Sequence, residues 1–198
     1  MFRIDFNSSF LPLVIISFLL SCCKKDPKYN YASDEVRDFI AFQPGSYWIY
    51  RDDSTNSEDS VWASSVHSRW MPDDSGDELF YNEQVICYVR INNSPDSNYF
   101  GAFQNAFGYA LYDWSCGLSL NPNDPSYGNS IFKIDSLLVD TNLFYNVYNI
   151  NDSITWSLHT YTHIDINIVS KIGLLKWNVL YKDGHTQQKT LIRYNTIQ

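Results

Sequence analysis

The sequence predicts a mainly β protein, either an antiparallel sandwich or an open, curled barrel, with one short N-terminal helix. Aromatic residues make up 17% of the chain and charged residues only 18%, and aromatic side chains pack well on a pleated, half-buried surface. From residue 46 onward, apolar segments of strand length alternate with turns rich in Asp, Ser and Asn. No segments of helix length separate these strands, so we expect antiparallel pairing.

The chain divides into three parts. We expect a lipoprotein signal peptide over residues 1–21, a lipidated tether over 22–33 and a single antiparallel β domain over 34–198. The last part is long enough to bury a sizeable core.

The signal peptide is predicted from the order of residues at the N-terminus. Arg3 precedes an apolar run from Phe10 to Leu20, which is too short to cross a hydrocarbon core about 30 Å thick at about 1.5 Å per residue. The run ends in Leu19-Leu20-Ser21-Cys22, which resembles the lipobox of bacterial lipoproteins. The resemblance implies that the Cys22 thiol receives a diacylglyceryl group and that the signal is cut before it. The alternative is an ordinary signal peptide followed by two incidental cysteines.

The anchor defines the expected location and partners. Acyl chains on Cys22 would hold the protein on a membrane that it does not span. The following Cys23-Lys24-Lys25-Asp26-Pro27 resembles the export signal of Bacteroidota surface lipoproteins, which implies the outer membrane and the cell surface. The alternative is a plain solvated linker and the periplasmic face. A net charge of −8 and a pI near 4.8 leave nothing to neutralise phosphates, so nucleic acid is not an expected partner.

The first element of the domain is a short helix. Ser33 offers a capping hydroxyl and Pro44-Gly45 ends the segment. Apolar residues at helical spacing lie between them, namely Val36, Phe39 and Ile40.

About ten strands follow the helix. Their expected segments are 46–52, 60–70, 82–92, 99–114, 131–139, 143–150, 153–169, 172–181 and 186–194.

The clearest hairpin joins the last two of these segments. Asp183-Gly184 suits a two-residue type I′ turn. Pairing outward from such a turn sets four residues of the first strand on one face, Tyr181, Val179, Trp177 and Leu175, opposite Thr186, Gln188, Thr190 and Ile192. The other face then receives Asn178, Lys176, Lys189 and Arg193.

Both ends of the domain carry a second resemblance. The segments "FQPGSYWIYRDDS", at 42–54, and "IGLLKW" with "TLIRYN", at 172–177 and 190–195, are similar to a group of uncharacterised Bacteroidota lipoproteins. The resemblance implies a β domain and the envelope location, and no catalytic residue.

Two groups of residues suggest a hydrolase. In "HTYTHID", strand periodicity places His159, His163 and Asp165 on one face, where they could contribute to a zinc site, although the polar face of a half-exposed strand has the same pattern. The carboxylate pairs Asp52-Asp53 and Asp73-Asp74 suit a glycosidase, but Asp is also favoured in turns.

Other residues have both a functional and a structural interpretation. Cys87 and Cys116 could form one disulfide in an exported protein, or Cys87 could be a buried free thiol. Asp-Ser-aliphatic tripeptides that resemble Bacteroidota O-glycosylation sites contain Ser60, Ser136 and Ser153. An aromatic segment would stack on sugars if exposed and form core if buried; it contains Tyr99, Phe100, Phe103, Phe107, Tyr109, Tyr112 and Trp114.

The sequence therefore leaves two functions open. The first is a lipid-anchored envelope protein that binds a glycan or protein ligand without catalysis or cofactor. The second is a glycan-acting or metal-dependent hydrolase on the same surface.

Overall fold

The structure is a computed structural model that describes residues 26–73, 80–92, 98–103, 106–111, 114–119, 130–153 and 161–198. Within these ranges the chain forms one helix, α2 (Asp34–Arg37), and twelve strands. The first six strands are β1 (Lys28–Asn30), β2 (Tyr47–Asp52), β3 (Glu58–Asp73), β4 (Phe80–Ile91), β5 (Asn98–Phe103) and β6 (Ala106–Leu111). The other six are β7 (Trp114–Ser119), β8 (Ser130–Val139), β9 (Asn142–Ser153), β10 (Tyr161–Val169), β11 (Gly173–Tyr181) and β12 (Thr186–Asn195).

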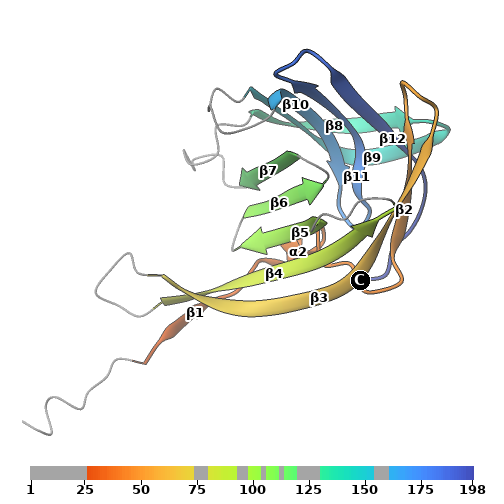
Figure 1. Cartoon of the computed structure of the whole chain (residues 1–198). Helices are drawn as coiled ribbons and strands as arrows, with labels where there is room; N and C mark the ends of the chain where they lie inside the picture. The colour runs from red at the N-terminus through yellow and green to blue at the C-terminus, as the bar shows by residue number, and fades with distance from the viewer. Residues whose placement is uncertain are drawn as a thin grey trace, which may run out of the picture.

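All strands belong to one sheet that curls on itself (Figure 1). Its order is β7-β6-β5-β4-β3-β2-β12-β11-β10-β9-β8, with β1 pairing to β4 outside this path. The pairing is antiparallel apart from the β1–β4 contact, which is parallel. The predicted antiparallel β class is confirmed, and of its two forms the single curled sheet is the one present. No helix of the described part is long and apolar enough to cross a membrane.

The N-terminal segment fills the concave side of the sheet, where α2 lies (Figure 1). The predicted cap is present, because the Ser33 hydroxyl accepts a hydrogen bond from Val36 N at 3.3 Å. After the helix, Phe39 stacks on Phe107 of β6 at 4.8 Å between ring centroids. Phe42 packs edge-on against Trp48 of β2. The segment thus carries apolar side chains into the core from inside the curl.

Residues 28–33, the end of the expected tether, lie against the domain. β1 pairs with β4, and Ala32 is buried. The Glu83 carboxylate accepts hydrogen bonds from Ala32 N, the Ser68 hydroxyl and the Arg37 guanidinium. Residues 28–32 are therefore held on the domain by strand pairing and by the hydrogen bond from Ala32 N to Glu83.

The β11–β12 hairpin differs from the prediction of a two-residue turn, which is wrong. Gly184 N donates to Tyr181 O at 3.0 Å and Tyr181 N donates to His185 O at 2.9 Å, so the loop has three residues with Gly184 at φ +88°. This geometry is a type I turn followed by a bulge. The pairing shifts by one residue, which exchanges the two faces of β12.

The shifted register places Lys189 opposite Trp177. Both residues are buried, and the Lys189 ammonium forms an ion pair with Asp59. Burial lowers the pKa of Lys189, and the nearby carboxylate of Asp52 opposes this shift. Lys189 was expected on the polar face, and its position among core residues follows from the single extra residue in the turn.

Candidate functional site

Several predicted site residues lie outside the described part of the chain. Cys22 and His159 are among them, as is Asp74. The backbone is described, but not the side chain, at Cys116 and Ser153.

Two of the three metal candidates, His163 and Asp165, lie on β10. His163 pairs with Leu180 and Asp165 with Asn178, so both project from one face, as predicted. The Asp165 carboxylate accepts a hydrogen bond from the Asn149 amide at 2.7 Å. Within the described ranges, no group of three His, Cys, Asp or Glu residues is placed to hold a metal ion.

The Asp52 carboxylate holds the turn after β2, and the Asp53 carboxylate binds β12. Asp52 accepts hydrogen bonds from Ser54 N and Thr55 N, both at 3.0 Å. Burial opposes ionisation of Asp52, but the hydrogen bonds from Ser54 and Thr55 lower its pKa. Asp53 accepts a hydrogen bond from the Thr190 hydroxyl at 2.8 Å. Both groups thus stabilise local structure, and the lowered pKa of Asp52 is the opposite of what a general acid requires.

Cys87 is a buried free thiol, one of the two predicted alternatives. Its Sγ donates to the carbonyl of Phe42 at 3.3 Å, and burial raises its pKa to about 12. The register Cys87–Phe100–Tyr109–Cys116 crosses four neighbouring strands. At about 4.8 Å per strand the two cysteine Cα atoms are roughly 14 Å apart, beyond the reach of a disulfide.

The aromatic segment divides between the two faces of the sheet. Phe100, Phe107 and Tyr109 are buried in the core. Tyr99 is 41% exposed and belongs to the opposite face. Most of the described aromatic side chains in this segment therefore serve the core, and Tyr99 alone among them remains a candidate contact for a ligand.

The glycosylation candidates differ in exposure. Ser136 on β8 is exposed, and Ser60 on β3 is half-buried. Ser60 pairs with Ile49, on the face turned away from the core.

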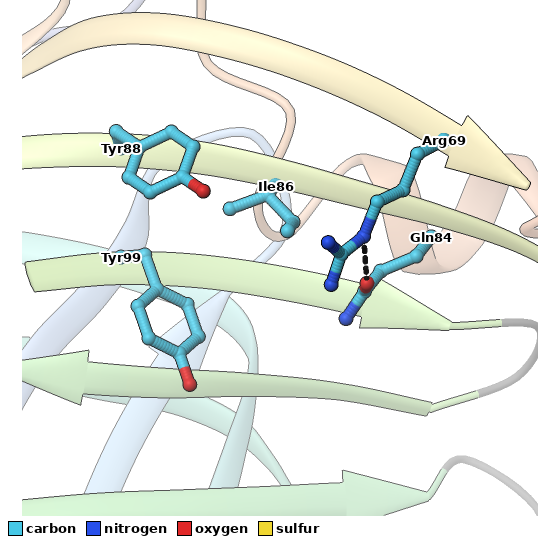
Figure 2. Close-up of a pocket in the computed structure, with 5 residues that line it drawn as sticks. All are labelled: Arg69, Gln84, Ile86, Tyr88 and Tyr99. Atoms are coloured by element: carbon cyan, nitrogen blue, oxygen red, sulfur yellow. Dashed lines mark hydrogen bonds between the residues drawn. The ribbon is translucent and has the colours of Figure 1, made fainter. Parts of the chain in front are cut away.

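A surface pocket lies on β3, β4 and β5, on the face opposite the core (Figure 2). Its volume is about 360 Å³, and it is lined by Arg69, Gln84, Ile86, Tyr88 and Tyr99. Tyr88 and Tyr99 are directly opposite each other on adjacent strands and are 39% and 41% exposed. Figure 2 shows the two rings side by side, with Ile86 between Tyr88 and the Arg69–Gln84 pair.

The polar side of the pocket is fixed by a hydrogen bond. Arg69 Nε donates to Gln84 Oε1 at 2.7 Å, and the two residues pair across β3 and β4. The bond orients the guanidinium and leaves its terminal amino groups able to donate to a ligand. His67 extends the rim, with its ring 5.8 Å from that of Tyr88.

The sheet beside the tyrosines has small side chains. Ile86 is followed across the sheet by Gly101, Gly108 and Gly117 in one row of paired residues. The row next to it contains Ala110 opposite Tyr99. A flat, elongated ligand could therefore continue from the tyrosine rings over these strands without meeting a large side chain along either row.

Sequence reasoning identified Tyr99 but not its partners in the pocket. The signal was present in β4, where Gln84, Ile86 and Tyr88 alternate with the buried Val85 and Cys87. Period two separates the faces of one strand, but it does not reveal which strands are neighbours. The pocket depends on that pairing.

Comparison with protein-family models and with curated proteins finds no match to this chain.

Proposed function

We propose that this chain is a lipid-anchored protein of the bacterial outer membrane, facing the cell surface, whose β domain is a non-enzymatic module that binds glycans. The lipobox-like Leu19-Leu20-Ser21-Cys22 and the similarity of both domain ends to Bacteroidota lipoproteins support the anchor and the location. The pair of exposed tyrosines, Tyr88 and Tyr99, is the observation that carries the binding role.

The chemistry of the pocket suits a sugar chain. A pyranose ring offers an apolar face of C–H groups, and the rings of Tyr88 and Tyr99 supply a matching apolar surface with hydroxyls at its edge. Sugar hydroxyls need donors and acceptors beside that surface, which Arg69 and Gln84 provide. An open pocket of this size encloses only part of a ligand, so we expect weak binding to each site and strength from repeated contacts along a polymer.

The anchor is tested by metabolic labelling. Cells that express the full chain and are fed radioactive palmitate should incorporate label, and mass spectrometry should find an acylated Cys22 as the mature N-terminus. Cys22→Ala should abolish both, whereas Cys23→Ala should change neither. A mature protein that begins at an unmodified residue would refute the anchor, as would label retained at Cys23 in the Cys22→Ala variant.

The binding site is tested by substitution on a glycan panel. The double variant Tyr88→Ala/Tyr99→Ala should bind a retained polysaccharide at least tenfold more weakly than the parent chain, at unchanged far-ultraviolet circular dichroism. Tyr145→Ala is the matched control, because Tyr145 is 63% exposed on β9 and lies outside the pocket. Equal binding by the parent and the double variant, or no retention of any polysaccharide, would count against the proposal.

A further inference from the structure

A second group of aromatic side chains lies at the end of the sheet where the described chain begins. Tyr29 and Tyr31 come from the N-terminal segment, Trp70 from β3 and Tyr81 from β4. The Trp70 ring is 5.0 Å from each of Tyr29 and Tyr31, and Tyr29 stacks on Tyr81 at 5.6 Å. We call these four residues the N-terminal aromatic patch. In Figure 1, β1 lies beside the ends of β3 and β4 that project from the curled part of the sheet.

The patch is exposed although its members contact one another. Tyr29 is 50%, Tyr31 67% and Trp70 39% exposed, and Tyr81 is half-buried; three exposed large rings in contact are unusual on a protein surface. Next to them, the Lys28 ammonium lies 5.2 Å from the centre of the Phe80 ring. Each patch residue combines an apolar ring with a hydroxyl or indole N–H, and this combination is enriched where hydrocarbon meets headgroups in a membrane.

We propose that the N-terminal aromatic patch docks the domain on the headgroup layer of the membrane that holds its anchor. The inference rests on the proposed acylation of Cys22. Five residues lie between Cys22 and Lys28, and the patch begins at Tyr29, seven positions after Cys22. At about 3.5 Å per position this length of chain reaches roughly 25 Å, so the anchor keeps the patch within that distance of the bilayer at all times. Tethering at such short range makes a weak interfacial contact sufficient.

The net charge of −8 provides no overall attraction of the domain to an anionic leaflet, so we assign the affinity of the domain itself to the aromatic rings. The orientation is compatible with binding. Trp70 pairs with Glu83 and Tyr88 with Tyr99, and the alternation along β4 puts Tyr81 and Glu83 on the face opposite Gln84 and Tyr88. Docking through the patch therefore leaves the pocket uncovered.

The experiment couples the chain to lipid chemically, so that it does not depend on acylation by the cell. The chain from residue 22, with Cys23→Ser and Cys116→Ser, is joined through the Cys22 thiol to a maleimide lipid in phosphatidylcholine vesicles. Cys87 is buried and does not compete. The vesicles carry bromine on the acyl chains near the headgroups, which quenches tryptophan that reaches the interface.

Bromine should quench the tryptophan emission of the coupled chain, and Trp70→Phe should remove at least half of that quenching. Tyr29→Ser and Tyr31→Ser should each reduce it, because they take away rings that hold Trp70 at the interface. Tyr145→Ser, at a residue 63% exposed on β9, should leave it unchanged. Quenching that is equal in the parent and Trp70→Phe chains, or absent from both, would overturn the docking. Loss of palmitate labelling in cells would instead refute the anchor alone.

Discussion

Single residues connect distant parts of this chain, and Glu83 is the clearest case. Its buried carboxylate accepts hydrogen bonds from Ala32 N at 3.2 Å and from the Ser68 hydroxyl at 2.6 Å, and it pairs with the Arg37 guanidinium. Burial by itself raises the pKa of Glu83, but these hydrogen bonds and the charge of Arg37 outweigh it and lower the pKa. One ionised side chain thus fixes the N-terminal segment on β3 and β4.

Glu83→Gln should reduce the free energy of unfolding at pH 7 by about 2 kcal/mol, because hydrogen bonds to an ionised acceptor are replaced by weaker ones. In the unfolded chain the pKa of Glu83 is about 4.3, and in the folded protein it is lower. The contribution is therefore complete above the unfolded value and is lost as the pH falls through the folded value. Urea unfolding at pH 7, 5 and 3 should show the difference between parent and variant shrinking toward acid.

Glu58→Gln is the matched control for this experiment. Glu58 forms an ion pair with Arg193 at 3.7 Å, and both side chains are more than half exposed. The same substitution there should change stability by no more than about 0.5 kcal/mol. A Glu83→Gln effect as small as this, or one that is constant with pH, would contradict the role of the carboxylate.

At the scale of elements, the sequence was informative about strands and uninformative about their partners. Alternation along the chain predicted the β class and the approximate ranges of most strands, and Ser33 ahead of apolar residues at helical spacing predicted the helix cap. It did not predict the register of β11 and β12, because a turn one residue longer uses the same Gly184 with a positive φ. The binding pocket was missed for a related reason: Tyr88 and Tyr99 become neighbours only through pairing of β4 with β5.

Two glycines with nearly equal backbone angles offer a test of this local chemistry. Gly173, at the start of β11, has φ +90° and Gly184 has φ +88°. A Cβ at Gly173 would lie 3.3 Å from the Phe42 ring, whereas one at Gly184 would meet nothing within 4 Å. Gly184→Ala should therefore cost only the left-handed backbone, about 1–2 kcal/mol. Gly173→Ala should cost about 2–4 kcal/mol, because crowding against Phe42 adds to the same strain.

Thermal or urea unfolding of the two variants measures the difference. Because the strain of the left-handed backbone is nearly the same at both glycines, the extra loss of unfolding free energy in Gly173→Ala measures the crowding against Phe42. Phe42→Leu in the Gly173→Ala background should recover part of that excess. Equal losses of the free energy of unfolding for the two glycine variants would contradict this, because they would show that Phe42 moves aside without a measurable cost in stability.

At the scale of the whole molecule, the open sheet is held together across its concave side by the N-terminal segment. The Tyr109 hydroxyl of β6 donates to Phe39 O at 3.0 Å, and Lys171 N, before β11, donates to Asp38 O at 2.7 Å. Phe39 also contacts Phe107 of β6 and Tyr148 of β9. The sheet has two arms, β4–β7 on one side and β8–β12 on the other, which strand pairing joins through β3 and β2. The contacts of the N-terminal segment with both arms therefore couple them directly across the concave side.

Phe39→Ala should therefore destabilise the entire domain, by about 3–5 kcal/mol, because it opens a cavity where both arms meet. The parent and the variant should each unfold in one transition, with tryptophan fluorescence and far-ultraviolet circular dichroism coinciding along the urea axis. Phe132→Ala is the control, since Phe132 is 60% exposed on β8, and it should cost no more than about 0.5 kcal/mol. Two separate transitions in the parent would contradict the coupling, because the arms would then unfold independently. A loss below about 1 kcal/mol for Phe39→Ala would do the same, since a residue that bridges both arms from a fully buried position cannot be removed so cheaply.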